Sequence, residues 1–112
     1  MDVTIRRRGQ IIGVKKEKLE EYLDLHRNIP EDIQTMLLEA GFLKLEIFVQ
    51  ELPNGDCYLF QYNEQVPGNE SALDNNRYRE WLRITGECQM PLPGETFWKD
   101  MDDAYTLHPP KN

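Results

Sequence analysis

Residues 43–62, with the sequence LKLEIFVQELPNGDCYLFQY, predict a β-hairpin. Every second residue from Leu43 to Val49 is aliphatic, and this period of two is typical of a strand that buries one face. The segment PNGD at 53–56 contains an Asn-Gly pair, which favours a tight turn because it accepts positive φ. Residues 57–62 then return as the partner strand, so the chain contains at least one antiparallel strand pair.

Helical patterns lie on both sides of this hairpin. From Leu19 to His26, apolar and aromatic residues recur at spacings of three and four, and charged residues fill the wet face. Pro30 interrupts that helix. Because proline is tolerated in a first helical turn, we expect a second helical segment that is capped at residue 28 or 29 and ends at Gly41. After the hairpin, residues 74–89 predict another helix, which begins at Asp and Asn caps.

Two outer strands complete the pattern. Residues 5–14 predict a first strand that ends in an apolar cluster, and residues 97–107 predict a last strand from the alternation between Met101 and Leu107. The order β, α, β, β, α, β predicts an α+β fold of the ferredoxin-like type, with both helices on one face of an antiparallel four-stranded sheet. The opposite face lacks a cover, so we expect a homodimer in which two sheets pack together as a dimeric α/β barrel.

Length and composition indicate one folded domain. A chain of 112 residues suits a single hydrophobic core, and we assign residues 1–112 to one domain, with its core at about 5–107 and a short tail at 108–112. With 39% hydrophobic and 29% charged residues, the composition is that of a globular protein. The net charge of −7 argues against nucleic acid and anionic membranes as partners, because both require clustered cations.

The sequence also favours a cytoplasmic protein without a metal or other cofactor. No apolar stretch approaches the roughly 20 residues of a membrane span, and the start MDVTIRRRGQ lacks the apolar run of a secretory signal. Cys57 and Cys88 lie far apart without CxxC spacing, which argues against a zinc site and predicts buried, reduced thiols. The sequence contains no recognisable glycine loop for a nucleotide and no nucleophile triad.

Tyr22 and His26 are the candidate catalytic pair. They are four residues apart and therefore lie on one face of the predicted helix. Histidine has an unperturbed pKa of about 6.5, so it can give or take a proton near neutral pH, and a phenol beside it can orient a substrate hydroxyl. Most such pairs on helices serve packing or lie on the surface, so the pair alone does not define a site.

Four segments together resemble the L-rhamnose mutarotase family: EEYLDLHRNIPEDI at 20–33, LLEAGFLKLEIFV at 37–49, NNRYREWLRIT at 75–85 and MDDAYTL at 101–107. The resemblance extends from about residue 6 to residue 107. It implies a small dimeric α+β barrel that binds a monosaccharide and interconverts the α and β anomers of a deoxy-hexose such as L-rhamnose or L-fucose. That reaction opens and closes the sugar ring by acid–base catalysis and requires no metal or redox cofactor.

The resemblance also implies roles for single residues. His26 matches the catalytic proton donor, which would transfer a proton to and from the ring oxygen, while Tyr22 and Trp81 match substrate-binding residues. Leu82 stands where the family has a second tryptophan, and Leu45 stands where it has a tyrosine. These two replacements predict a site that is reshaped for another sugar or less active on rhamnose. From spacing alone, Trp81 would be a core residue.

Two other functions fit the same sequence. A catalytically silent sugar-binding or interaction domain would keep the barrel and bind sugar without faster anomer exchange. A cofactor-free monooxygenase or a haem-degrading protein would use the same fold, but haem propionates require cations, and this acidic chain has few. Tyr62 and Trp98 would compensate for the missing aromatics if they face the pocket, and His108 in the tail receives no role.

Overall fold

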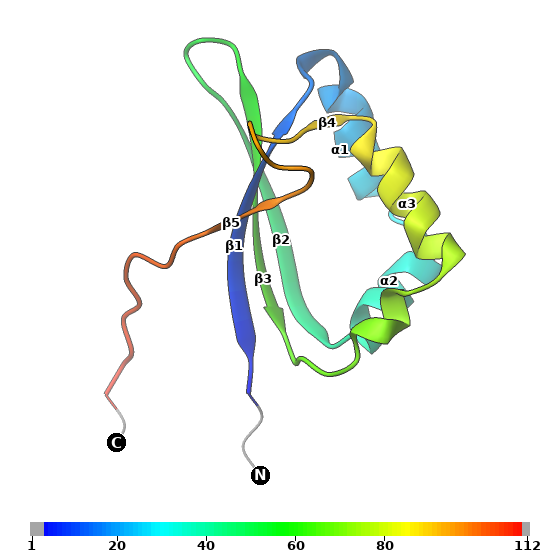
Figure 1. The fold of residues 1–112 in the computed structure, drawn as a ribbon, viewed down its shortest axis with the longest axis vertical. Coiled ribbons are helices and arrows are strands. Elements are labelled where there is room, and N and C mark those ends of the chain that lie inside the picture. Colours follow the sequence, from blue (N-terminus) through cyan, green and yellow to red (C-terminus); the bar gives the residue numbers. More distant parts are fainter. Residues whose placement is uncertain (1–3, 111–112) are drawn as a thin grey trace.

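A computed structural model describes residues 4–110 and contains a curled antiparallel sheet with helices on one face (Figure 1). The strands are β1 (Arg6–Val14), β2 (Phe42–Glu51), β3 (Cys57–Gln65), β4 (Gln89–Met90) and β5 (Lys99–Met101). The helices are α1 (Leu19–Arg27), α2 (Glu31–Glu39) and α3 (Asn76–Gly86), with short 3-10 helices at Lys16–Lys18 and Glu70–Leu73. None of the helices between residues 4 and 110 has the length and apolar character of a membrane span.

The sheet has the strand order β2-β3-β1-β4, and β5 pairs with β1 alongside β4. The predicted α+β, ferredoxin-like arrangement is confirmed, and the curled sheet of one chain forms half of a barrel (Figure 1). The expected fourth strand is divided into two short pieces, because β4 pairs only with residues 13–14 of β1 and β5 only with residues 9–11.

The predicted hairpin and helices are confirmed with small differences. In the hairpin turn, Gly55 has a φ of 93°, and the Leu52 N–H donates to the Asp56 carbonyl at 2.7 Å. The N-cap of α2 is Pro30 and not residue 28 or 29, because the fixed φ of proline already suits a helix start. The N-cap of α3 is Asn75, whose side chain accepts a hydrogen bond from the Tyr78 N–H at 2.8 Å.

The structure corrects the sequence-based prediction mainly for the two C-terminal elements. The helix predicted to reach residue 89 ends at Gly86, because Cys88 leaves it to accept a hydrogen bond from the Lys15 N–H at 2.8 Å. The last strand predicted at 97–107 is regular only at 99–101, and residues 102–110 leave the body without regular structure (Figure 1). Tyr105 is 78% exposed, so the alternation there finds no core within this chain. Of the predicted tail, residues 111–112 lie outside the described part.

The register between β1 and β3 divides the helix-facing side of the sheet into two halves. Ile12 pairs with Leu59 and Val14 with Cys57, and these four residues form the core together with Tyr22 and Cys88. The next pairs on the same face are Gln10 with Gln61 and Arg8 with Asn63. One half of the sheet therefore anchors the helices, and the other half presents polar side chains. Cys57 and Cys88 are both free and buried, as predicted.

Gly13 allows β4 to lie close against β1. A Cβ at Gly13 would lie 2.5 Å from the Met90 carbonyl oxygen, whereas a Cβ at Gly9 would meet only the flexible end of Met101 at 3.3 Å. We therefore expect Gly13→Ala to displace β4 and to lower the free energy of unfolding by about 1–3 kcal/mol. The matched change Gly9→Ala should alter it by less than about 0.5 kcal/mol. Urea denaturation measures both values, and equal losses would contradict this packing.

Candidate active site

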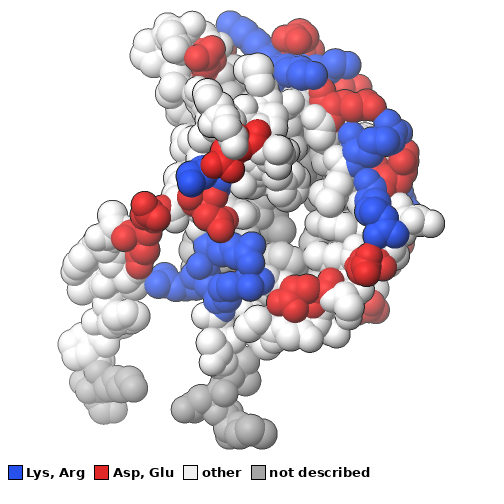
Figure 2. Space-filling model, viewed as in Figure 1, with Lys and Arg blue, Asp and Glu red and all other residues white. Residues whose placement is uncertain are grey.

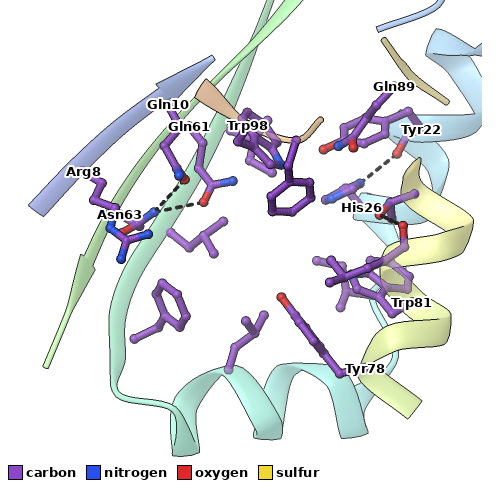
Figure 3. A pocket seen from close by; sticks show the side chains of 18 residues that line it. Arg8, Gln10, Tyr22, His26, Gln61, Asn63, Tyr78, Trp81, Gln89 and Trp98 are labelled. Carbon is purple, nitrogen blue, oxygen red and sulfur yellow. Dashed lines mark hydrogen bonds between the residues drawn. The ribbon is translucent and has the colours of Figure 1, made fainter. Parts of the chain in front are cut away.

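A cavity of about 190 Å³ lies between the polar half of the sheet and the helices (Figure 3). Its size is below the roughly 300–1,000 Å³ of pockets for drug-sized ligands and therefore suits a small ligand. Figure 3 shows two facing walls. The sheet contributes Arg8, Gln10, Gln61 and Asn63, and the helices contribute Tyr22, His26, Tyr78 and Trp81.

His26 is held in one tautomer by its own helix. Its Nδ1 lies 3.0 Å from the Tyr22 carbonyl oxygen, which can only accept, so Nδ1 carries the hydrogen and Nε2 retains its lone pair. Burial lowers the pKa of His26 below its ordinary value of 6.5, and the hydrogen bond to Tyr22 offsets only part of this effect. At neutral pH the side chain is therefore a neutral imidazole that is ready to accept a proton.

Two aromatic rings fix the orientation of this imidazole. The Tyr22 ring stacks on it with centroids 4.2 Å apart and planes at 29°, and the Trp81 ring is tilted at 56° with its centroid 5.7 Å away. Tyr22 is only 2% exposed and Trp81 only 7%. Burial raises the pKa of Tyr22, so its phenol stays neutral. The three residues selected from the sequence thus lie together. Tyr22 stacks on His26 from the core side, and its burial largely shields it from a ligand.

Of the other residues that the sequence analysis named, some line the cavity and others lie away from it. Trp98 lines the cavity, as do Leu45 and Leu82, the two aliphatic replacements. Tyr62 does not line it: its hydroxyl donates to Glu64 at 2.7 Å on the opposite face of the sheet. Tyr62 therefore does not meet the condition that its side chain faces this cavity, whereas Trp98 does. His108 lies exposed in the tail, away from the cavity lining.

Tyr78 is a cavity residue that the sequence reasoning did not select for the site. Its hydroxyl points into the cavity (Figure 3) and forms no hydrogen bond with any residue in the described range 4–110. Burial raises the pKa of this phenol, so it remains a neutral hydrogen-bond donor and acceptor. In the sequence, the helical spacing of Tyr78 before Trp81 indicated only a packing residue. Spacing alone does not show whether a tyrosine hydroxyl is directed into a cavity or into the core.

The sheet wall carries a network of amides that the sequence reasoning also missed. The Asn63 side-chain amide donates to the oxygens of Gln61 at 3.0 Å and Gln10 at 3.4 Å, and Gln10 donates in turn to Asp100 at 2.8 Å. The Gln61 amide nitrogen and the Asn63 oxygen remain without a side-chain partner among residues 4–110. A signal was present, because the inward positions change from polar to apolar along β1 and from apolar to polar along β3.

The arrangement combines a proton acceptor with hydroxyl-binding groups. A neutral imidazole, a phenol and several amides around a small cavity are suited to a polyhydroxylated ligand and to proton transfer on it. Within residues 4–110, no three His, Cys, Asp or Glu side chains are grouped to hold a metal ion.

Comparison with known proteins relates this geometry to one family. The family model described as L-rhamnose mutarotase matches residues 7–107 of the chain. A UPF0734 protein from Dictyostelium discoideum is 26% identical over an alignment of 106 positions, and the match covers 82% of this chain and 80% of that protein.

Solved structures share the fold. The crystal structure of the L-rhamnose mutarotase FA22100 from Formosa agariphila has a TM-score of 0.71 at 15% identity and covers 92% of this chain and 99% of its own. A conserved protein from Methanosarcina mazei Go1 has a TM-score of 0.57 at 24% identity, with coverage of 88% and 91%. A Nitrosomonas europaea protein assigned to the antibiotic biosynthesis monooxygenases also reaches 0.57, at 12% identity, with coverage of 94% and 95%. At these identities, the likeness extends to the fold alone.

The tautomer and pKa of His26 are directly measurable. We expect ¹⁵N NMR of the imidazole to report a hydrogen on Nδ1 at neutral pH, and a titration midpoint below 6.5 because burial disfavours the charged ring. The His26→Gln variant identifies the signals by their loss. A hydrogen on Nε2, or a midpoint above 6.5, would contradict the geometry of this site.

Proposed function

Because the chain belongs to the L-rhamnose mutarotase family over residues 7–107, we propose that it interconverts the α and β anomers of an aldose such as L-rhamnose or L-fucose. The family implies an isomerase, and the specific sugar and the residue roles are our proposal. The observation that carries it is the neutral His26, whose Nε2 lone pair lies in a cavity lined by hydroxyl-binding groups.

His26 acts first as a base in this proposal. Ring opening requires that the anomeric hydroxyl lose a proton while the ring oxygen gains one. A neutral imidazole fits the first transfer better than the protonation of the ring oxygen expected from the sequence, because its Nδ1 hydrogen is committed to the Tyr22 carbonyl. Water or the Tyr78 hydroxyl supplies the proton to the ring oxygen, and the imidazolium returns its own proton when the ring closes. General acid–base catalysis of this kind contributes roughly 10²–10⁴-fold.

The two walls are suited to the two sides of a sugar ring. Trp81 and the aliphatic Leu45 and Leu82 offer an apolar surface to C–H groups, and the amides of Gln61 and Asn63 offer donors and acceptors to hydroxyls. Tyr22 is a positioning residue in this account, since its ring and carbonyl hold His26. Trp98 is the candidate for an additional aromatic contact.

We also propose a homodimer formed through the open face of the sheet. On that face Phe60 lies between its cross-strand neighbours Phe48 and Ile11, and Phe48 is 57% exposed. A row of large apolar side chains on an uncovered sheet favours burial against a second copy. The extended segment at 102–110, whose Thr106 accepts a hydrogen bond from Arg7 at 3.3 Å, has further exposed apolar residues, Tyr105 and Leu107. A cytoplasmic location accords with the two free thiols.

A silent sugar-binding domain remains the second candidate. The observation that favours it is the aliphatic lining at Leu45 and Leu82, which reduces aromatic contact with a sugar. It differs from the first proposal in one measurable property, because it binds sugar without accelerating anomer exchange.

Anomer exchange tests the catalytic proposal. We expect the protein to accelerate exchange of L-rhamnose or L-fucose, measured by saturation-difference proton NMR, and His26→Gln to lower the rate roughly 10²–10⁴-fold because the base is lost. The rate should be highest where the imidazole is neutral and fall as the pH decreases, with a midpoint below 6.5, since a protonated imidazole accepts no proton.

The matched control is His108→Gln, which removes the exposed tail histidine and should leave the rate unchanged. Circular dichroism confirms that both variants are folded. Equal rates in wild type and folded His26→Gln would refute the role of His26, and binding without any acceleration would favour the silent domain.

The dimer has a separate test. We expect sedimentation velocity to give twice the 13.2 kDa of one chain, and Phe48→Glu to give the monomer because it places a charge in the apolar contact. Leu38→Glu is the control, since Leu38 is 69% exposed on α2 and away from the open face. A wild-type monomer at high concentration would rule the proposal out.

A further inference from the structure

Arg8 introduces a cation into the cavity. It lies on β1 opposite Asn63, two residues before Gln10, and therefore faces the helices and not the open side of the sheet. Figure 3 shows its side chain beside Asn63 on the sheet wall, across the cavity from His26 and Trp81. A ligand that extends from His26 to the sheet would thus meet a guanidinium group.

Among residues 4–110, no carboxylate lines the cavity to neutralise this charge. Of the described residues that line it, Arg8 alone is permanently charged, since the rest are apolar, amide, hydroxyl or the neutral His26. Arg8 forms no ion pair or side-chain hydrogen bond with any residue in the range 4–110. Its guanidinium therefore retains its full set of donors for a ligand.

The neighbouring arginines and carboxylates are already engaged. Arg6 donates to Gln65 and lies 3.6 Å from Glu70. Glu70, whose pKa Arg8 helps to lower, is held mainly by its own backbone N–H and that of Gly68 and is closer to Arg6. Arg7 faces the other side of the sheet and donates to Thr106 at 3.3 Å. The basic side chains over the lower part of β1 border the hollow between sheet and helices in Figure 2.

The composition of the chain makes an unpaired cation in the cavity unexpected. Acidic residues outnumber basic ones by 20 to 13, so carboxylates to pair with Arg8 are abundant in the composition. Partly burying a cation without a partner costs free energy, and a ligand anion would recover it. For a neutral sugar, by contrast, an amide or hydroxyl at this position would suffice.

We propose that the preferred substrate of this site is an acidic aldose, a uronate, whose carboxylate binds the Arg8 guanidinium while its anomeric centre faces His26. The proposal rests on the proposed mutarotase function and refines its substrate class, so that the neutral deoxy-hexose becomes the poorer substrate. A carboxylate matches the fork of donors on arginine and can accept two parallel hydrogen bonds. For a doubly charged phosphate, the single cation among the described lining residues would leave one negative charge unpaired.

The test compares sugars that differ only at C6. D-Galacturonate is paired with D-fucose and D-glucuronate with 6-deoxy-D-glucose, while D-galactose 6-phosphate replaces the carboxylate by phosphate. For at least one acid, we expect kcat/KM for anomer exchange to exceed that of its 6-deoxy partner about 10 to 100-fold. Arg8→Gln should remove this preference by raising KM with little change in kcat, because the contact is equal in ground and transition states.

Arg7→Gln is the matched control, since it removes the same charge from the adjacent residue on the opposite face and should preserve the preference. If both 6-deoxy sugars exchange as fast as their acids, or if the preference survives in Arg8→Gln, the proposal is overturned while exchange of L-rhamnose still supports the mutarotase function. A preference for the phosphate over both acids would overturn the choice of carboxylate.

If none of these sugars nor L-rhamnose or L-fucose is exchanged, the proposed function fails by itself. The role of Arg8 is then decided by calorimetric affinity for the same pairs. Tighter binding of an acid, lost in Arg8→Gln and kept in Arg7→Gln, supports an acidic-sugar site. Equal affinity within each pair overturns it.

Discussion

The register of β1 against β3 is the constraint on which both the core and the site depend. It pairs Ile12 with Leu59 and, one step along the same face, Gln10 with Gln61. Because side chains alternate along a strand, a shift of one residue would turn the apolar and the polar pairs to the other side together. The helices pack against the apolar half, and the polar half is left opposite a cavity. The core and the candidate site thus use different ends of one sheet face.

The helix wall of the cavity follows from the same packing. Tyr22 is fully buried in the core, and its carbonyl and ring hold His26 one turn later on α1. Trp81 on α3 encloses the imidazole from the other side. The buried position that lowers the pKa of His26 is therefore a consequence of core packing. The proposed proton transfer requires a neutral imidazole at position 26, and burial in the fold favours that neutral form.

Much of the fold was predictable because local patterns determine it. The Asn-Gly turn with alternating flanks gave the hairpin, and spacings of three and four gave α1 and α3. The last strand was predicted too long because alternation between Met101 and Leu107 indicates a strand only where a neighbour exists. In this chain β1 offers three residues of pairing, and the remaining side chains find no surface to cover.

The site was predictable only in part. His26 and Trp81 could be selected because a family resemblance supported the indication from their helical spacing. Tyr78 has the same kind of spacing but was not selected, because the direction of its hydroxyl depends on tertiary packing. Arg8 belongs to a run of three arginines, and alternation alone does not tell which of them faces a cavity. The pairing partner on β3 decides this, so the sheet wall needed the three-dimensional register.

A crystal structure with a bound aldose would test most directly whether the two walls form one binding site. The account predicts that the sugar lies between His26 and the amides of Gln61 and Asn63, with its anomeric hydroxyl within hydrogen-bond distance of His26 Nε2. A sugar bound instead on the opposite face of the sheet, near Arg7 and Tyr62, would contradict it. So would a cavity that stays empty while saturating sugar binds elsewhere.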